Sequence, residues 1–590
     1  MCGIVGYIGG RKAASVALES LRKLEYRGYD SAGFATVYRG SLSVKKAVGK
    51  IDEASEGFGV EKAEGTVAIA HSRWATHGKV TKENAHPHCD CKNSVAIVHN
   101  GIIENFQELR TGLEKRGHCF LSETDSEVLA HLIEENISGN SLEVAVSLAL
   151  KEVKGSYAIL AISKSDGDKF VAARRESPLL IGLGKDEVFA SSDALPLLGR
   201  ASKAIVLGEG QVALVTPKSV KVFDPEGVEV SPVLQDLNWS VQEASKNGFE
   251  HFMLKEILEE PQMIKSALAQ DQRLLEEMAG EIVRAHRVMF IACGTSRHSA
   301  LVGRYLFSRL ADKYCDVMIG SEYSYFADQA DRKTLVLAIS QSGETADVLD
   351  GVRRAKAKGA RVFSLVNVVN SSLDRLSDRS ILLNCGPEIG VAATKSFINQ
   401  LVVFYLLAFA AVGRFEEGKS LLGQMAEDVQ LTINENKEKA IKLAEKIHNK
   451  PAAYFLGRGI NFAIALEGAL KFKEVTYIHA EGMPAGELKH GTLALIDKGT
   501  PVVSLNPKDY TYYETLSNAL ETKARGAFLI GVGDEENVEY DSFMKIPVVE
   551  EIFYPLLTIV PLQLLAYYTA VKKGNDPDRP RNLAKSVTCK

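Results

Sequence analysis

The chain has 590 residues, more than the roughly 250–300 at which a single hydrophobic core stops growing, so several domains are required. A composition of 46% hydrophobic and 25% charged residues is typical of globular proteins and excludes a largely disordered chain. The formal net charge of -5 provides no basic field for binding along phosphates, so we expect no nucleic-acid partner. The eight cysteines are irregularly spaced, unlike the dense framework of a small secreted domain, and we expect a reducing cytoplasm.

The first candidate for chemistry is Cys2, next to the initiator methionine. Removal of Met1 would leave Cys2 with a thiol and a free α-amine, whose pKa in model compounds is about 7.7–8.0. Because this amine can accept the thiol proton, through a water molecule, one residue supplies both nucleophile and base. The alternative is that Cys2 is a small buried hydrophobic residue. A strand-like run follows Met1 at once, so we expect no signal peptide.

Residues up to about 230 are dominated by short apolar runs rich in β-forming side chains. The clearest runs are 67–70, 95–98, 157–160 and 211–215. Because few helical patterns lie between them, they predict layered sheets with flanking helices.

Several of these runs are closed by polar segments, any one of which by itself reads as an ordinary turn. The segments are Arg27-Gly28-Tyr29-Asp30-Ser31-Ala32-Gly33, His71-Ser72-Arg73-Trp74-Ala75-Thr76-His77-Gly78, His99-Asn100-Gly101-Ile102-Ile103-Glu104-Asn105 and Ser122-Glu123-Thr124-Asp125-Ser126-Glu127. As a set they resemble the class II, N-terminal-nucleophile glutaminase domain. The resemblance covers residues 1 to about 235 and implies a four-layer αββα sandwich.

The same resemblance implies roles for individual residues around Cys2. Arg73 is expected to pair with the α-carboxylate of glutamine and Asp125 with its α-ammonium, by charge-assisted hydrogen bonds. The side-chain amide of Asn100 and the backbone N–H of Gly101 are expected to form the oxyanion hole. The remaining residues expected to line this pocket are Trp74, Thr76 and His77.

One segment in this region invites a different interpretation. His86-Pro87-His88-Cys89-Asp90-Cys91 holds several potential zinc ligands within six residues. Neighbouring side chains on so short a segment do not easily converge in a tetrahedron, so we expect no metal site. The His-Pro-His part matches the glutaminase family, whereas Cys89 and Cys91 have no role that the family implies.

Around residues 225–250 the chain becomes polar and turn-forming, and we place a linker there. Beyond it, three pairs of similar strand segments recur at an offset of roughly 165 residues, which indicates duplicated domains. The pairs are 288–294 with 453–459, 335–340 with 501–505, and 359–363 with 525–529. Alternation of strand and helix favours parallel sheets, which bind ligands beyond the carboxyl ends of their strands.

Two hydroxyl-rich loops follow strands of the first copy and lead into helical patterns. They are Cys293-Gly294-Thr295-Ser296 and Ser340-Gln341-Ser342-Gly343-Glu344-Thr345. Hydroxyls and backbone N–H groups at a helix start can hold a phosphate dianion, although a plain Ser/Thr helix cap is the alternative. Together the loops resemble the sugar isomerase (SIS) domain. The resemblance implies that a sugar phosphate is bound by Ser296, Ser340, Gln341, Ser342 and Thr345.

The second copy lacks this loop but offers titratable side chains. Glu467, Lys471 and Glu474 are spaced i, i+4, i+7 and share one helical face, which could also be a solvated face with weak ion pairs. Two more motifs, Glu487-Leu488-Lys489-His490-Gly491 and Arg581-Asn582-Leu583-Ala584-Lys585-Ser586-Val587-Thr588, extend the match. With them, essentially the whole chain resembles the family of isomerizing glutamine:fructose-6-phosphate aminotransferases.

This resemblance implies conversion of D-fructose 6-phosphate and L-glutamine to D-glucosamine 6-phosphate and glutamate, without a cofactor. Lys585 is expected to form a Schiff base with the open-chain ketose, His490 to assist ring opening and Glu474 to move a proton between sugar carbons. Lys471 and Glu467 are expected to support that proton transfer, and Val391 to touch the sugar. The family also implies an ammonia channel with Trp74 as its gate, and a homodimer in which the partner subunit can supply His490.

The expected fold is a multidomain α/β protein, an N-terminal αββα Ntn-hydrolase glutaminase sandwich followed by two SIS-type parallel α/β domains. The expected boundaries are a glutaminase domain at 2–235, a linker and entry helix at 236–275, SIS domains at 276–420 and 440–575, and a tail entering the sugar site at 576–590. The uncharged stretch 552–571 is interrupted by Pro555, Thr558, Pro561 and Gln563, so we expect a buried core helix and no membrane partner.

Two other functions remain as alternatives. A glutaminase fused to an SIS deaminase, working in the degradative direction, would keep the phosphate loop but has little use for Cys2. A non-enzymatic sensor of sugar phosphates needs only the binding loop and should lack Glu474, His490 and Lys585 together. All three are present, so we favour the aminotransferase.

Overall fold

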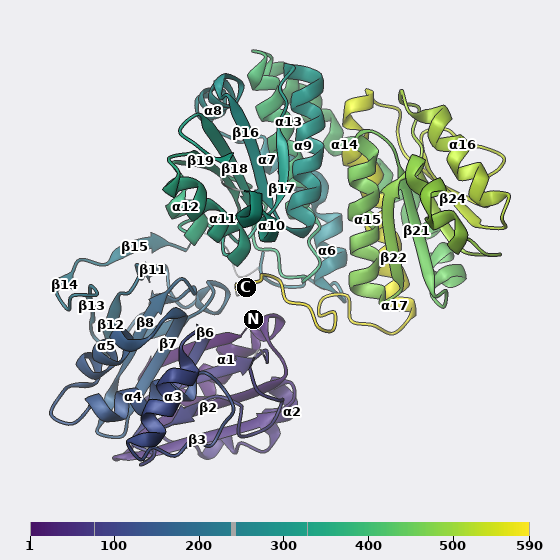
Figure 1. The fold of residues 1–590 in the computed structure, drawn as a ribbon. Coiled ribbons are helices and arrows are strands. Elements are labelled where there is room, and N and C mark those ends of the chain that lie inside the picture. Colours follow the sequence, from purple (N-terminus) through teal and green to yellow (C-terminus); the bar gives the residue numbers. More distant parts are fainter. Residues whose placement is uncertain (1, 76, 238–242, 327–328, 589–590) are drawn as a thin grey trace. The chain divides into compact units, whose positions relative to one another are not determined.

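The computed structural model describes residues 2–75, 77–237, 243–326 and 329–588 (Figure 1). The chain divides into two compact units, which we call the amino-terminal and the carboxy-terminal unit. The amino-terminal unit comprises Met1–Ala244 together with Ser586–Lys590, and the carboxy-terminal unit comprises Ser245–Lys585. The last residues of the chain therefore belong to the unit that contains the first.

The amino-terminal unit is built on two antiparallel sheets. The eight-stranded sheet has the order β15-β11-β9-β10-β1-β4-β2-β3, and the seven-stranded sheet the order β14-β13-β12-β8-β7-β6-β5. The strands of the first are β1 Gly3–Gly9, β2 Ser31–Tyr38, β3 Ser41–Val48, β4 Val67–Arg73, β9 Leu180–Leu183, β10 Glu187–Ser191, β11 Lys203–Val206 and β15 Val233–Asp236. Those of the second are β5 His88–Cys89, β6 Val95–Ile103, β7 Gly155–Ser163, β8 Asp166–Arg175, β12 Val212–Val215, β13 Val220–Phe223 and β14 Glu229–Val230.

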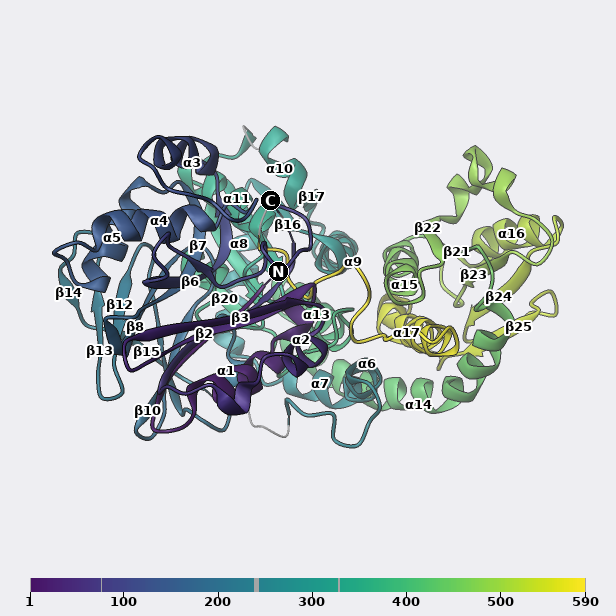
Figure 2. The same cartoon turned by 90° about the horizontal axis from the view of Figure 1, so that it is seen from below.

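The layers follow from the two-residue period of the strands. In β6, Ala96 and Val98 face the core between the sheets, whereas Val95 and Ile97 face the helices on the other side. Those helices are α3 Phe106–Lys115, α4 Glu127–Asn136 and α5 Leu142–Glu152, while α1 Ala13–Arg22 packs on β1 and β4 and α2 Ile51–Glu56 on β2. The unit is thus a four-layer αββα sandwich, as predicted (Figure 2).

The carboxy-terminal unit contains two parallel five-stranded sheets, with the orders β17-β16-β18-β19-β20 and β22-β21-β23-β24-β25. The first is formed by β16 Arg287–Ala292, β17 Asp316–Ile319, β18 Thr334–Ser340, β19 Arg361–Val366 and β20 Arg379–Leu382. The second is formed by β21 Ala452–Gly457, β22 His479–Pro484, β23 Pro501–Leu505, β24 Phe528–Gly533 and β25 Ser542–Lys545. The segments that repeat in the sequence occupy equivalent central positions, so the duplication is confirmed.

Apolar helices join the two sheets of this unit into one continuous core. The long helix α14, Phe415–Ile447, packs on α17, Tyr554–Lys572, and α15, Ile460–Thr476, packs on both α17 and α9, Gly294–Ala311 (Figure 1). The other helices are α6 Phe252–Leu258, α7 Glu260–Ala267, α8 Gln272–Arg284, α10 Gly320–Phe326, α11 Ala346–Ala357, α12 Ser372–Leu376, α13 Lys395–Ala411 and α16 Tyr512–Lys523.

The helix containing α17 is the one described stretch that is long and apolar enough to cross a membrane. It spans Glu551–Lys572, and 89% of its most apolar window is buried inside the protein. It is the core helix predicted for residues 552–571, because its apolar surface is covered by α14 and α15.

Candidate functional site

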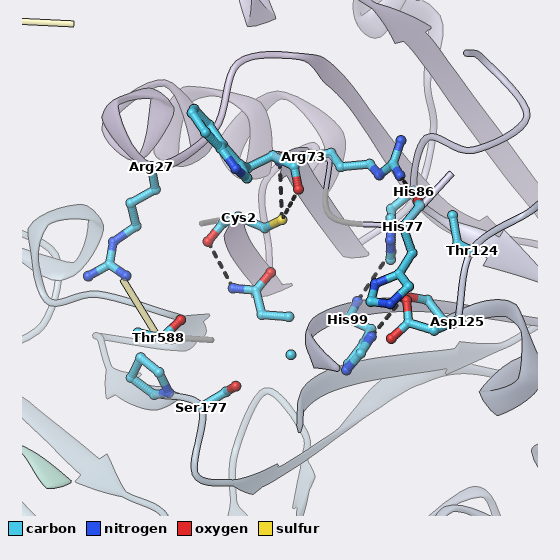
Figure 3. Close-up of a pocket in the computed structure, with 15 residues that line it drawn as sticks. Cys2, Arg27, Arg73, His77, His86, His99, Thr124, Asp125, Ser177 and Thr588 are labelled. Carbon is cyan, nitrogen blue, oxygen red and sulfur yellow. Dashed lines mark hydrogen bonds between the residues drawn. The ribbon is translucent and has the colours of Figure 1, made fainter. Parts of the chain in front are cut away.

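Cys2 lies directly before the central strand β1 of the amino-terminal unit. Pairing of Gly3 with Ser72 places Cys2 beside the end of β4, where the backbone N–H of Trp74 donates a hydrogen bond of 3.2 Å to the Cys2 sulfur. A Cβ on residue 3 would lie 2.7 Å from the hydroxyl oxygen of Ser72, so a glycine allows this close approach. Cys2 is half-buried and lines a pocket (Figure 3).

Asn100 is tied to Cys2 by its side-chain amide. Its Nδ2 donates to the backbone carbonyl of Cys2 at 2.9 Å, and its Oδ1 lies 3.0 Å from Nε2 of His71. Nε2 of His71 also lies 3.0 Å from the carbonyl oxygen of His99. Because both neighbours of Nε2 are acceptors, this nitrogen carries the proton. Burial lowers the pKa of His71 to about 3, so the ring is neutral and fixes the direction of the Asn100 amide.

Gly101 follows Asn100 in a conformation that favours glycine. Its φ is +133°, and a Cβ would lie 2.1 Å from the carbonyl oxygen of Ser156 on the neighbouring strand β7. Any side chain at position 101 would therefore displace the strand that carries Asn100. Both residues line the pocket that contains Cys2.

Arg73 ends β4 and holds the loop that follows it. Its guanidinium donates to the carbonyl oxygens of His77, Gly78 at 3.3 Å and Lys79 at 3.2 Å. Burial lowers the pKa of Arg73, although the nearby Cys2, Asp30 and Asp125 act in the opposite direction. Thr76, which was also expected in this loop, lies outside the described residues.

Asp30 orders the same turn, a role that the sequence analysis did not assign. Its carboxylate accepts the N–H of Ala75 at 2.9 Å, while its own N–H donates to the carbonyl of Arg73 at 3.0 Å. The motif around Asp30 was recognised, but its partner is 45 residues away, so the contact was not visible in the sequence.

Asp125 faces the pocket from the segment before α4. One of its oxygens accepts the N–H of Ile103 at 2.8 Å, and Ser126 beside it contacts Nδ1 of His99 at 2.8 Å. Burial also lowers the pKa of His99. Arg73 and Asp125 thus lie in one pocket with opposite charges, as recognition of an amino acid requires.

The pocket brings together most of the residues expected for glutamine binding. Its lining consists of Cys2, Arg27, Arg73, Trp74, His77, His86, His99, Asn100, Gly101, Thr124, Asp125, Ser126, Ser177, Pro178 and Thr588. In Figure 3, Arg27, Ser177 and Thr588 lie on the side of Cys2 opposite Asp125. These three were not among the residues predicted for the pocket, and for Thr588 no local signal in the sequence indicates it.

The residues of the His86–Cys91 segment diverge in the structure. The His86 ring stacks on His71 at a centroid distance of 4.1 Å, and Nε2 of His88 lies 3.1 Å from the Thr124 hydroxyl. Burial raises the pKa of the Cys89 thiol to about 11, and Cys91 is exposed beyond β5. These side chains thus have separate partners, although the rings of His86 and His88 lie 4.5 Å apart.

In the carboxy-terminal unit, the two hydroxyl-rich loops meet at one edge of a sheet. Ala292 pairs with Ile339 in register, so the loops that follow β16 and β18 start side by side. Ser296 lies in the first turn of α9, where its hydroxyl accepts a hydrogen bond of 2.9 Å from the amide of Gln400. The first loop thus opens a helix beside the second, in a position suited to an anion.

The second loop is a tight turn between β18 and α11. The hydroxyls of Ser340 and Thr345 lie 2.9 Å apart, and the N–H of Gly343 donates to the Ser340 hydroxyl at 3.1 Å. Gly343 has a φ of +65°, and a Cβ there would lie 2.0 Å from the hydroxyl of Ser371. Glycine is therefore required both by the backbone and by the close neighbour. Gln341 and Ser342 lie within this turn, before Gly343.

The titratable residues of α15 form a buried network rather than a solvated face. The Lys471 ammonium lies 2.7 Å from Glu474, 3.5 Å from Glu467 and 3.0 Å from the hydroxyl of Thr295 at the start of α9. Glu467 accepts further hydrogen bonds from Thr295 at 2.9 Å and meets Nδ1 of His298 at 2.7 Å. Burial alone would lower the pKa of Lys471, but Glu474 and Glu467 raise it. The network joins α15 to the loop that carries Ser296.

Lys585 is held by a buried carboxylate that the sequence analysis missed. Its ammonium donates to Glu388 at 2.5 Å and to the carbonyl of Gly390 at 2.7 Å, next to Val391. Burial opposes ionisation of Glu388, yet the charge of Lys585 lowers the pKa of Glu388 to about 2. Burial, reinforced by the charge of Glu388, raises the pKa of the adjacent Glu256 to about 7.

Not every expected residue joins this group. His490 ends the 3₁₀ helix Ala485–His490 and is exposed, whereas Lys471 and Glu467 are fully buried. Glu388 also contributes to the raised pKa of Lys471, which links the Lys585 pair to the α15 network. The carboxy-terminal unit thus gathers two lysines and several carboxylates next to hydroxyl-rich loops.

Comparison with known proteins matches both units. The glutamine amidotransferase domain model matches residues 71–198, and the SIS domain model matches residues 281–410 and 446–573. The chain is 47% identical to a glutamine–fructose-6-phosphate aminotransferase (isomerizing) of Thermococcus kodakarensis, and 46% identical to one of Aquifex aeolicus, over 100% of each chain. A solved C-terminal domain of glucosamine-fructose-6-phosphate aminotransferase from Francisella tularensis matches 57% of this chain and 99% of its own, with 35% identity and a TM-score of 0.53.

Proposed function

The chain belongs to the family of isomerizing glutamine–fructose-6-phosphate aminotransferases, and from this premise we propose how its residues carry out the reaction. It converts D-fructose 6-phosphate and L-glutamine to D-glucosamine 6-phosphate and L-glutamate. The observation that carries this function is the identity over the full length of the chain, which includes the glutaminase and both SIS domains.

We assign glutamine hydrolysis to Cys2. Its thiolate attacks the side-chain amide carbon of glutamine, the α-amine of Cys2 takes the thiol proton and returns it to the leaving ammonia, and water then cleaves the thioester. Asn100 and the backbone of Gly101 stabilise the oxyanion of each tetrahedral intermediate. The Trp74 N–H at the sulfur and the tethered amide of Asn100 support this assignment.

Selection of free glutamine is assigned to the two charged residues of the same pocket. Arg73 binds the α-carboxylate and Asp125 the α-ammonium, so a glutamine residue within a peptide lacks both partners. His77 and Trp74 complete the pocket, and Thr76 is proposed with them from the motif alone. Their common pocket and opposite charges support the proposal.

Amination and isomerisation are assigned to the carboxy-terminal unit. Ser296, Ser340, Ser342 and Thr345, with Gln341, bind the phosphate and neighbouring hydroxyls of fructose 6-phosphate. Lys585, once it has lost its proton, attacks the open-chain carbonyl as a neutral amine and forms an imine, with loss of water, that ammonia from glutamine then displaces. Its hydrogen bonds to Glu388 and to the carbonyl of Gly390, the residue before Val391, support this role, and we place Val391 against the sugar.

Proton transfer between the sugar carbons is assigned to Glu474. Lys471 and Glu467 hold it in place, because their buried ion pairs restrict the carboxylate to one position. His490 is proposed to assist ring opening, from a second copy of the chain in a homodimer, which agrees with its exposure. No cofactor is needed for these steps. We also propose that the enzyme acts in the cytoplasm.

Ammonia has to pass between the two reactions without release to water, where it would be protonated and lose its nucleophilicity. We therefore propose an internal path with Trp74 as its gate. The proposed domain boundaries are 2–235 for the glutaminase, 236–275 for the linker and entry helix, 276–420 and 440–575 for the SIS domains, and 576–590 for the tail.

Substitution at Cys2 and Lys585 tests the two assignments separately. The Cys2→Ala variant is expected to lose glutamine-dependent synthesis of glucosamine 6-phosphate by at least about 10³-fold and to keep synthesis from added ammonia. The Lys585→Arg variant keeps the charge but cannot form the imine, so it should lose both syntheses and retain basal glutamine hydrolysis. Unchanged glutamine-dependent activity in Cys2→Ala, or borohydride trapping of the sugar away from Lys585, would refute the respective assignment.

The role of the phosphate-binding loop can be tested at Gly343, with Gly386, a glycine outside the loop, as the control. Gly343→Ala is expected to raise the KM for fructose 6-phosphate about tenfold or more, because the new Cβ meets Ser371. Gly386 has a similar φ of +62° but open space at its Cβ position, so Gly386→Ala carries the same backbone cost without the clash. Equal KM values in the two variants would contradict the proposed role of the loop.

A further inference from the structure

A cluster of potential metal ligands lies in the amino-terminal unit, outside the lining of the glutamine pocket. Cys91 follows β5, His118 follows α3, and His131 and Glu134 lie three residues apart on one face of α4. One ligand atom from each residue lies within 4.8 Å of all the others. The other three residues are 27 to 43 positions from Cys91 along the chain, so no short spacing motif indicates this cluster.

The separations in this cluster agree with those around a tetrahedral ion. Bonds of about 2.0–2.3 Å from zinc to nitrogen, oxygen and sulfur place neighbouring ligand atoms roughly 3.3–3.7 Å apart. The Cys91 sulfur lies 3.5 Å from Nδ1 of His118 and 3.5 Å from Nδ1 of His131. Oε2 of Glu134 lies 3.1 Å from the first nitrogen and 3.5 Å from the second. The side chains are thus already close to the required arrangement.

The outer nitrogens of both histidines face further carboxylates. Nε2 of His118 lies 3.2 Å from Glu135, and Nε2 of His131 lies 3.7 Å from Glu127. A carboxylate behind each ligating imidazole is the usual surrounding of a protein zinc site, because it fixes the ring and its tautomer.

A hydrogen-bond network without a metal accounts poorly for this arrangement. Each ring has a carboxylate at both nitrogens, but a neutral imidazole has only one N–H to donate. Without a cation, one nitrogen of each neutral ring therefore has no proton to donate to the carboxylate beside it. A cation at the two Nδ1 atoms removes this conflict, because the Nε2–H of each ring then faces its outer carboxylate.

We propose that Cys91, His118, His131 and Glu134 bind one zinc ion. The thiolate and the carboxylate balance the two positive charges of the ion, and binding releases the thiol proton of Cys91 to solvent. The backbone N–H of Cys119 points at the Cys91 sulfur at 3.4 Å and would stabilise the thiolate. Sulfur and imidazole ligands favour zinc over magnesium or calcium.

Four protein ligands leave no open position, so the site is structural rather than catalytic. The ion would connect the loop after β5 and the segment after α3 to α4. The helix begins at Glu127, two residues after Asp125 of the glutamine pocket, so the ion would hold in place the segment that carries Asp125.

The full-length protein, stripped with a chelator and titrated with Co²⁺ and Zn²⁺, tests the proposal. Cobalt should produce the visible bands of a tetrahedral complex and a thiolate-to-cobalt charge-transfer band, both saturating at one equivalent, and zinc should displace it. Zinc should also raise the thermal midpoint of the amino-terminal unit. Absence of the charge-transfer band in the wild-type protein would overturn the site.

Two variants test the ligands, and a third is their control. Cys91→Ser, at an exposed position, should lose the charge-transfer band and at least nine-tenths of the bound zinc, and His131→Gln should lose the tetrahedral bands. Cys119→Ser is the matched control, because Cys119 contributes only its backbone, and should bind one equivalent like the wild-type protein. Zinc content unchanged in Cys91→Ser refutes the proposal. Circular dichroism checks that each variant is folded, and if buried His131→Gln does not fold, Cys91→Ser alone decides.

Discussion

His71 illustrates how a residue can act through another at the scale of single side chains. Its neutral ring donates from Nε2 to Oδ1 of Asn100, which leaves Nδ2 of Asn100 to point towards Cys2. The proposed oxyanion hole therefore depends on a hydrogen bond behind it. His71 was part of a recognised motif, but nothing in the motif indicated which atom it orients.

We expect His71→Leu to reduce kcat for glutamine-dependent synthesis roughly fivefold to tenfold, because one hydrogen bond of about 1 kcal/mol that orients the amide is lost. His71→Gln places an N–H near the position of Nε2 and should restore most of the rate. Synthesis from added ammonia should be unchanged in both variants. Steady-state kinetics with the two nitrogen donors measure the effect, and an equal loss with ammonia would show that His71 has only a general structural role.

At the scale of elements, the sequence predicted the helical face of Glu467, Lys471 and Glu474 but left its surroundings open. The structure buries the face against the start of α9, so the ion pairs join two helices instead of meeting solvent. A buried lysine between carboxylates is worth more than an exposed pair, because its removal leaves charges without compensation.

We expect Lys471→Met to lower the stability of the carboxy-terminal unit by about 3–5 kcal/mol, because Glu467 and Glu474 lose their buried counter-charge. Lys473→Met is the matched control, since Lys473 lies on the same helix but is exposed, and should change stability by less than about 0.5 kcal/mol. Calorimetry of the corresponding unfolding transition measures both. Equal transition temperatures for the two variants would contradict the importance of the network.

At the scale of the whole molecule, acid should affect the amino-terminal unit through its buried histidines. Burial lowers the pKa values of His71, His86, His88 and His99, to about 3 for His71. Between the ordinary value of 6.5 and the lowered values, the unfolded chain binds protons that the folded unit does not. The stabilisation is therefore complete above pH 6.5 and is lost as the pH falls towards about 3.

We expect the unfolding free energy of this unit to fall on acidification by up to about 1.4 kcal/mol per pH unit for each such histidine. Thermal midpoints recorded from pH 7 to pH 4 measure the slope. Replacing one of the four histidines by a residue that does not titrate, as in His99→Gln, should reduce this slope. The reduction should be up to about 1.4 kcal/mol per pH unit, which is the contribution of one proton. A slope that is unchanged in His99→Gln, or a unit that gains stability in acid, would contradict this origin.

The sequence by itself determined the architecture and much of the local chemistry. The apolar run from Val95 to Val98 predicted a strand of the layered sheets, and the repeated strand segments predicted the two parallel sheets. The motifs around Arg73, Asn100 and Asp125 pointed to one pocket, which the structure describes. These features are readable because backbone geometry and short-range spacing place neighbouring residues in a known relation.

Only the tertiary structure decided which distant residues meet. Lys585 contacts Glu388 across 197 positions, Thr588 lines the pocket of the first residues, and Cys91 lies beside His118, which follows α3, and residues of α4. His490 lies exposed instead of among the buried groups. Such contacts are set by the packing of whole layers of helices and sheets. Because this packing depends on many weak apolar contacts spread over the entire chain, the local spacing of residues does not predict it.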